Sequence, residues 1–238
     1  MPQYFGLIWT LKPGSREAVE SLVRSTEYPE YVARDKDGTV TGALLRTVVF
    51  MKDNFLVRIN EFEGNFRELG QHMSRQKSIQ NFQTEMGKYI ESAIDISTPE
   101  GFQTFLRQTS LRFIVMKEHA PAREGSRFGA LTWTAKRDGQ QAVEKLLREA
   151  FDPQSADPGE ADTGKGRLVR TVVLMRDNRV IQVLEFEGDW NDVLQQAWRR
   201  PAVQALERKL KDHLEVARDT ADPEGAKAFF REASMRPI

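Results

Sequence analysis

The 238-residue sequence contains no cysteine, which excludes disulfide bonds, thiolate nucleophiles, iron–sulfur clusters and thiolate zinc sites. It contains only three histidines, His72, His119 and His213, far apart and without HxxxH or HxxE spacing, so we expect no metal site. Neither sign of charge is in excess, because 35 Lys and Arg balance 35 Asp and Glu. Without a basic block we expect no nucleic-acid partner.

Long apolar runs and cofactor motifs are missing as well. No run approaches the ~20 residues that span a bilayer, and the first residues lack a signal-peptide layout, so we expect a cytoplasmic protein without a membrane partner. The stretch Gly164-Lys165-Gly166 lacks the spacing of a P-loop, and neither GxGxxG nor GxSxG occurs. These absences predict a protein that uses no cofactor.

What the sequence does contain is a tandem repeat. A shift of 124 positions places LLRTVVFMKDN, from Leu44, on LVRTVVLMRDN, from Leu168, and NEFEGNF, from Asn60, on LEFEGDW, from Leu184. The repeating unit of roughly 110 residues exceeds the 20–50 residues of solenoid repeats, so each copy has the size of a domain.

Hydrophobic periodicity predicts the elements of one copy. Residues 4–12 alternate as a strand with one apolar face, and residues 15–26 carry a helical apolar stripe. Residues 44–51 and 55–63 are β-rich runs that flank a tight turn at Asp53-Asn54. If these two residues form the turn, Arg46 pairs with Glu61, and the same count pairs Arg170 with Glu185; we interpret both pairs as cross-strand ion pairs.

Helix signals follow the hairpin. Asn65 and its counterpart Asp189 are N-cap candidates for a long helical region, which Pro201 should interrupt in the second copy. Further short helices should start at Pro99 and Pro223, and residues 110–117 could supply a closing strand in the first copy.

This order predicts an α+β fold of tandem duplicated ferredoxin-like units that form an intrachain α+β barrel. One sheet with helices on a single face would leave its other face bare, and a second unit can cover it. We expect a first repeat over residues 1–117, a linker over 118–126 and a second repeat over 127–238. Residues 152–167, rich in Gly, Pro and Asp, are predicted to form a loop, as are residues 29–41.

The motifs WT, RTVV.M.DN, EFEG and PEG, present in both copies, resemble the SchA/CurD-like family, whose members are found with aromatic polyketide and spore-pigment gene sets. The resemblance also implies the dimeric α+β barrel superfamily, which includes cofactor-independent quinone-forming monooxygenases and polyketide cyclases. It implies an aromatic polyketide as the small-molecule partner.

Positions at which the copies differ indicate where one copy has specialised. The first copy has Arg58, Asn60 and His72 where the second has Gln182, Leu184 and Gln196. We predict that Arg58 steadies a phenolate or enolate, Asn60 binds a carbonyl and His72 accepts a proton. The alternative is that Arg58 is a paired surface charge and His72 a solvated helix residue.

Three further residues are predicted to contact the substrate. Trp9 would provide an aromatic wall, with Thr47 and Tyr89 beside it. Trp9 and Trp133 occur in both copies, so they would equally serve as core anchors.

Three functions are compatible with this set: a cofactor-independent monooxygenase acting on a phenolic polycyclic intermediate, a polyketide cyclase or aromatase, or a non-catalytic polyketide-binding protein. The monooxygenase is the leading hypothesis. The chain would be a monomer with a pseudo-dimeric barrel or a homodimer.

Overall fold

The structure, a computed structural model, describes residues 2–27, 29–92, 98–152, 166–216, 218, 220 and 222–238. Two compact units are present: unit 1 comprises Met1–Leu111 with Pro237–Ile238, and unit 2 comprises Arg112–Arg236. None of the helices within the described ranges has the length and apolar character needed to traverse a lipid bilayer.

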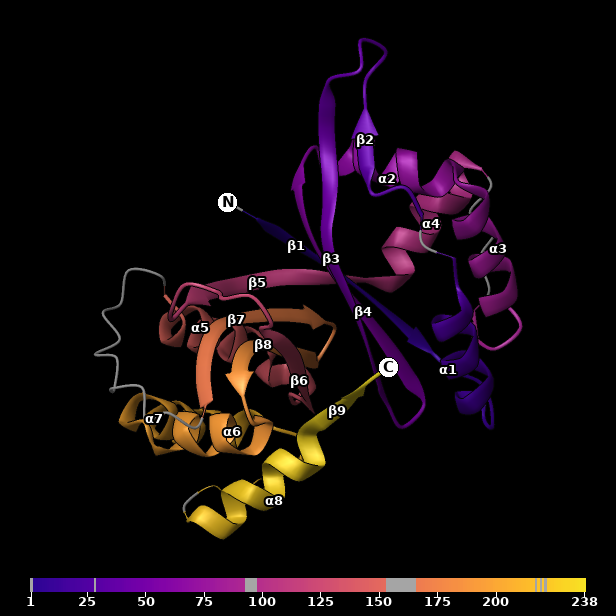
Figure 1. Cartoon of the computed structure of the whole chain (residues 1–238). Helices are drawn as coiled ribbons and strands as arrows, with labels where there is room; N and C mark the ends of the chain where they lie inside the picture. The colour runs from indigo at the N-terminus through magenta and orange to yellow at the C-terminus, as the bar shows by residue number, and fades with distance from the viewer. Residues whose placement is uncertain are drawn as a thin grey trace. The chain divides into compact units, whose positions relative to one another are not determined.

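Unit 1 is a ferredoxin-like α+β unit, as the periodicities predict. Its sheet has the strand order β2-β3-β4-β1, with the start of β5 beside β1, and helices α1 to α4 accompany it (Figure 1). The elements are β1 (Gln3–Thr10), α1 (Arg16–Ser25), β2 (Val32–Arg34), β3 (Val40–Lys52), β4 (Phe55–Gly64), α2 (Phe66–Arg75), α3 (Lys77–Met86), α4 (Pro99–Thr109) and the beginning of β5 (Ser110–Glu118).

The β3–β4 hairpin has the predicted register. Arg46 lies opposite Glu61, and Lys52 lies opposite Phe55 across the two-residue turn. Asp53 adopts a positive φ of 49°, which a tight hairpin turn requires. The Arg46 Nε to Glu61 Oε2 distance is 2.7 Å, so the predicted cross-strand ion pair is confirmed.

The helix that follows the hairpin differs from the prediction at one point. Asn65 caps α2 by accepting from the backbone N–H groups of Arg67 and Glu68, as predicted. However, the first copy breaks at Gln76, which has an extended ψ of 132° and separates α2 from α3. No proline marks this break, so the sequence pattern showed it only in the second copy, at Pro201.

Residues 29–41 are not simply a loop, contrary to the prediction. They contain β2, which pairs with β3 through Val32 opposite Ala43, and a turn in which Asp35 Oδ1 accepts from two backbone N–H groups. The counterpart loop of the second copy, with Gly164-Lys165, falls at residues 153–165, outside the described residues.

Both faces of the unit 1 sheet carry buried apolar side chains. Leu7, Trp9 and Leu56 pack with helix residues in the core of the unit. On the opposite face Phe50, Val57 and Ile59 are also buried. The prediction that the second face is not left bare is therefore confirmed.

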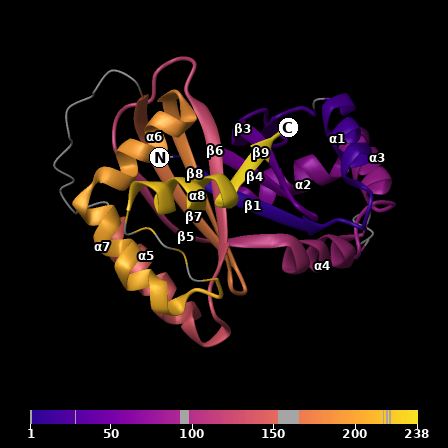
Figure 2. The same cartoon turned by 90° about the horizontal axis from the view of Figure 1, so that it is seen from below.

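Unit 2 repeats this plan with the strand order β5-β7-β8-β6-β9. Arg170 faces Glu185 as predicted, with 3.5 Å between Nη1 and Oε2, and Figure 2 shows α5 and α7 side by side. The elements are β5 from Arg112 onward, β6 (Arg127–Thr134), η1 (Arg137–Gly139), α5 (Gln140–Ala150), β7 (Gly166–Arg176), β8 (Arg179–Gly188), α6 (Trp190–Arg199), α7 (Pro201–Leu210), η2 (Lys211–His213), α8 (Pro223–Ala233) and β9 (Ser234–Pro237).

The predicted closing strand at residues 110–117 exists as β5. Within unit 1 only its first two residues pair with β1, Leu7 lying opposite Ser110 and Gly6 opposite Leu111. From Arg112 onward β5 pairs with β7 in unit 2.

Candidate functional site

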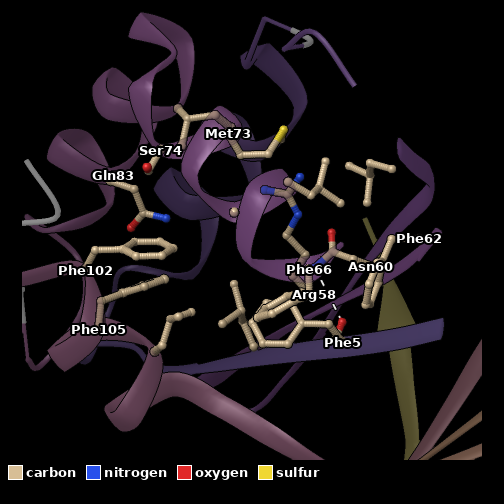
Figure 3. A pocket seen from close by; sticks show the side chains of 16 residues that line it. Phe5, Arg58, Asn60, Phe62, Phe66, Met73, Ser74, Gln83, Phe102 and Phe105 are labelled. Atoms are coloured by element: carbon tan, nitrogen blue, oxygen red, sulfur yellow. Dashed lines mark hydrogen bonds between the residues drawn. The ribbon is translucent and has the colours of Figure 1, made fainter. Parts of the chain in front are cut away.

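Two cavities lie within unit 1, between its sheet and its helices. The first, which we call the aromatic chamber, has a volume of about 110 Å³ (Figure 3). It is lined by Phe5, Leu7, Leu44, Arg58, Asn60, Phe62, Phe66, Leu69, Gly70, Met73, Ser74, Ile79, Gln83, Phe102, Phe105 and Leu106. The second, which we call the polar chamber, has a volume of about 350 Å³. It is lined by Trp9, Val23, Arg24, Thr26, Glu27, Pro29, Tyr31, Thr47, Val48, Val49, Leu56, Arg58, Ile79, Phe82 and Ile238.

Phenylalanine rings form the walls of the aromatic chamber. Phe5 and Phe66 are tilted against each other with their centroids 4.7 Å apart, and Phe102 and Phe105 stack at 6.3 Å. Figure 3 shows these two groups of rings on opposite sides of the cavity. Such an arrangement suits a flat apolar ring, because aromatic pairs favour tilted or offset contacts at these distances.

A chain of hydrogen bonds fixes the polar side chains at the sheet. Arg58 Nε donates to Thr47 Oγ1 at 3.0 Å, and Thr47 Oγ1 donates to Asn60 Oδ1 at 3.0 Å. Asn60 Nδ2 donates in turn to the Phe5 carbonyl at 3.5 Å. Three predicted site residues, Arg58, Asn60 and Thr47, are thus brought together because Thr47 and Asn60 face each other across the β3–β4 ladder.

Arg58 is a positively charged residue of the candidate site. It lines both chambers, and no carboxylate lies within ion-pair distance of it among the residues that the structure describes. Burial lowers the pKa of its guanidinium, while the nearby Tyr31 acts in the opposite direction. The positive charge is therefore held at a cost in free energy that an anionic ligand would offset.

Tyr31 is a site residue that the sequence reasoning missed. It lines the polar chamber and lies close enough to Arg58 to influence its pKa. The repeat comparison that singled out Arg58 also contains the signal, since Ser155 stands at the equivalent position of the second copy. Tyr31 precedes β2, in a segment that the sequence pattern predicts to be a loop.

His72 does not line either chamber, although the prediction required it to project into the cavity. Its Nε2 lies 3.0 Å from the carbonyl oxygen of Glu30, to which Gln76 Nε2 also donates at 2.8 Å. A carbonyl only accepts, so His72 Nε2 carries a proton in this contact. His72 and Gln76 thus hold the residue that precedes Tyr31.

Of the other two residues predicted to contact the substrate, Trp9 lines a chamber and Tyr89 does not. Trp9 lines the polar chamber and is also a core residue, with its ring 6.2 Å from that of Phe105. Tyr89 lines neither chamber; its backbone carbonyl accepts from the Lys12 N–H, and its side chain packs against the unit 1 core.

In unit 2 larger side chains stand where unit 1 is open. Leu184 replaces Asn60, Leu194 replaces Gly70 and Trp198 replaces Ser74. Leu184 and Leu194 are buried, and a Cβ built at Gly129, the counterpart of Phe5, would overlap the ring of Trp190. The space corresponding to the aromatic chamber is therefore filled by side chains.

An ion pair with little solvent exposure also lies in unit 2. The Arg218 guanidinium carbon lies 4.7 Å from the ring centroid of Trp133 and 4.1 Å from that of Phe229, and Arg218 Nε lies 2.7 Å from Glu207 Oε2. Trp133 and Phe229 are the counterparts of Trp9 and Phe105. In unit 2 these two aromatic rings therefore pack against the Arg218 side chain.

The fold and the two chambers define a ferredoxin-like α+β protein with cavities that a half-buried arginine borders. A family model described as "SchA/CurD like domain" matches residues 2–119 and again residues 127–238. The chain therefore belongs to the SchA/CurD-like family.

Three curated proteins are similar to this chain in sequence. The chain is 33% identical over 164 residues to a 42.8 kDa protein in the whiE locus of Streptomyces coelicolor (63% of this chain, 40% of that protein). It is 40% identical over 109 residues to the polyketide synthase CurD of Streptomyces cyaneus (46% and 28%) and 33% identical over 155 residues to protein SchA of Streptomyces halstedii (57% and 40%). The chain spans less than half the length of each of these relatives.

Solved structures show a weaker likeness. One, described as a candidate monooxygenase from Fusobacterium nucleatum, has a TM-score of 0.49 and 10% identity, covering 90% of this chain and 88% of that one. Another, described as an anthrone oxidase-like protein, has a TM-score of 0.43 and 11% identity, covering 90% and 86%.

Proposed function

We propose that unit 1 binds an aromatic polyketide as its phenolate and promotes its oxygenation by dioxygen without a cofactor. The observation that carries the proposal is the Arg58 guanidinium, which lacks a carboxylate partner among the described residues and borders a cavity walled by phenyl rings. The polyketide class is supported by the relative that is named a polyketide synthase.

Arg58 and its neighbours would stabilise negative charge on the substrate. A half-buried guanidinium lowers the free energy of a phenolate more than that of the neutral phenol. Thr47 holds Arg58 through Nε, which leaves the two terminal nitrogens to face the ligand. His72 carries no proton-transfer step in this proposal, because it lines neither chamber.

The reaction balances with dioxygen as the only oxidant. The ionised substrate transfers one electron to dioxygen, and the two radicals combine to form a carbon–oxygen bond. The resulting peroxide breaks its O–O bond, so the reacting CH₂ of a hydroxyanthrone becomes a carbonyl and the second oxygen atom leaves as water. The protein contributes by favouring the electron-rich anion, without which the first transfer is slow.

The test is oxygen uptake by the full chain with a hydroxyanthrone, in air and under nitrogen. We expect quinone formation only in air, with one dioxygen consumed per carbonyl formed. Arg58→Met should lower kcat/KM by about 10- to 100-fold, in line with the loss of one charge-assisted contact. The matched control is Gln182→Met, the same replacement at the equivalent position of unit 2, which should leave the rate unchanged.

Other outcomes would assign a different function. Ring closure of a polyketide chain without oxygen would indicate a cyclase, and binding without turnover would indicate an accessory binding protein. Equal losses in the Arg58 and Gln182 variants would contradict the placement of the site in unit 1.

A further inference from the structure

The two chambers of unit 1 meet at Arg58. Arg58, from β4, and Ile79, from α3, line both cavities, whereas the phenyl walls belong to the aromatic chamber and the hydroxyl-bearing residues Thr26 and Tyr31 to the polar one. A ligand that reaches Arg58 from the aromatic chamber therefore lies at the boundary with the polar chamber.

The volumes show that the aromatic chamber cannot hold a polycyclic ligand by itself. At about 110 Å³ it is of the same order as the ~150 Å³ apolar cavity that binds a single benzene, so it offers room for about one ring. The polar chamber is about three times larger, at about 350 Å³. The polar chamber reaches the lower end of the roughly 300–1,000 Å³ range of small-molecule sites, and the aromatic chamber adds to that volume.

The charges around the polar chamber restrict what can occupy it. Arg24 is already paired with Glu20, with 2.8 Å between Nη2 and Oε1, and the acidic residue Glu27 also lines the cavity. A second negative charge on the ligand would meet Glu27 and find no unpaired cation there except Arg58 among the described lining residues. Neutral hydroxyl and carbonyl groups fit this chamber, because they bond to hydroxyls and water without a charge penalty.

We infer that the ligand spans both chambers: one terminal ring lies in the aromatic chamber, a single anionic oxygen lies at Arg58, and a neutral, oxygen-rich remainder lies in the polar chamber. This inference rests on the proposed function, since it specifies the substrate class of the same site. It distinguishes substrates of three or more rings with an unequal distribution of oxygen from simple phenols.

Variants that narrow one chamber at a time test the inference. Gly70 lines only the aromatic chamber, and a Cβ there would lie 3.6 Å from Phe102, an ordinary contact, so the further atoms of Gly70→Leu would occupy the chamber as Leu194 does in unit 2. Val23 and Val49 line only the polar chamber, and Val23→Phe and Val49→Phe would narrow it from two different elements. Val40→Phe, on the exposed part of β3, is the matched control.

Binding is measured by calorimetry under nitrogen, so that no turnover occurs, with phenol and with a trihydroxyanthraquinone as probes. Gly70→Leu should weaken both ligands at least 10-fold. Val23→Phe and Val49→Phe should weaken the three-ring ligand at least 10-fold and phenol less than twofold, and Val40→Phe should change neither. Circular dichroism checks that each variant is folded, and the two polar-chamber variants provide independent tests if one is not.

The inference is overturned if the three-ring ligand binds the polar-chamber variants as tightly as the parent chain, or if phenol loses as much affinity as the larger ligand. A failure of the proposed oxygenation is distinguishable from this result. In that case no oxygen is consumed in air, while the pattern of binding to the variants persists.

Discussion

Two arginines withdrawn from solvent in part, Arg58 in unit 1 and Arg218 in unit 2, allow a direct comparison of stability. Burial lowers the pKa of both Arg58 and Arg218. Arg218 has the Glu207 carboxylate beside it and two aromatic rings against its guanidinium, whereas Arg58 has a hydrogen bond to exposed Thr47. Methionine keeps much of the side-chain volume of arginine. We expect Arg58→Met and Arg218→Met to change the free energy of unfolding in different directions.

For Arg58→Met, the loss is one hydrogen bond at an exposed hydroxyl, worth about 0.5–1 kcal/mol. The gain is relief of a desolvated charge without a carboxylate partner, which costs more than that bond returns. We therefore expect the free energy of unfolding to stay unchanged or to rise by about 1 kcal/mol. Affinity for a phenolate should fall by about 1.5–3 kcal/mol, or roughly 10- to 150-fold.

For Arg218→Met, we expect a loss of about 3–5 kcal/mol, because the Glu207 carboxylate would be left buried without its partner. Burial already raises the pKa of Glu207, and Arg218 opposes that rise. Without Arg218 the folded pKa would lie further above the unfolded value, so stability would fall as pH rises above about 4.5. The variant should thus be less destabilised at pH 5 than at pH 8.

Urea unfolding followed by circular dichroism at both pH values measures these changes, and calorimetry with a hydroxyanthraquinone measures affinity. The reasoning would be refuted if Arg58→Met lost as much stability as Arg218→Met. It would also be refuted if Arg58→Met bound the ionised ligand as tightly as the parent chain. The affinity difference should disappear below the pKa of the ligand phenol, where no charge faces Arg58.

Further predictions concern the ladder ion pairs, acid stability and His72. Glu61→Gln should cost about 1 kcal/mol because its partner Arg46 is 37% exposed, whereas Glu185→Gln should cost about 3 kcal/mol because its partner Arg170 is only 10% exposed; equal losses in urea titrations would contradict this difference. Hydrogen bonds from Arg112 lower the pKa of Glu144 to about 2. The ionised Glu144 therefore adds to the free energy of unfolding above pH 4.5, and this addition is lost as the pH falls toward 2. Glu144→Gln should reduce the loss of stability in acid by about 1 kcal/mol. His72→Ala should raise KM while leaving the pH dependence of kcat unchanged, and His72→Gln, which retains a donor for the Glu30 carbonyl, should restore KM. A shifted kcat profile would instead support His72 as the general base.

The fold of each unit was predictable because local patterns and turn chemistry agree. The Asp53-Asn54 turn predicts the hairpin register, and the confirmed Arg46–Glu61 pair follows from counting along the strands. Duplication strengthened the prediction, since the same signals occur twice. The break at Gln76 was missed because no local signal marks it, and β2 was missed because its three residues are too short for a periodicity to be seen.

The candidate site was predictable only in part. Arg58, Asn60 and Thr47 were found because cross-strand neighbours follow from register and the repeats differ at two of these positions. His72 was placed in the cavity wrongly, because which face of a helix meets a cavity depends on how the helix packs on the sheet. Its ring instead contacts the Glu30 carbonyl, in a segment whose path the sequence does not reveal.

The sequence alone determined the duplication, the α+β class, the hairpin register and the residues at which the two copies diverge. Those properties depend on spacing and on near neighbours along the chain or across one ladder. Only the tertiary structure decided that unit 1 contains two chambers that meet at Arg58, while Leu194, Trp190 and Arg218 fill the corresponding region of unit 2. The physical reason is that a cavity is the space left by side chains from several elements, and this space is set by packing in three dimensions.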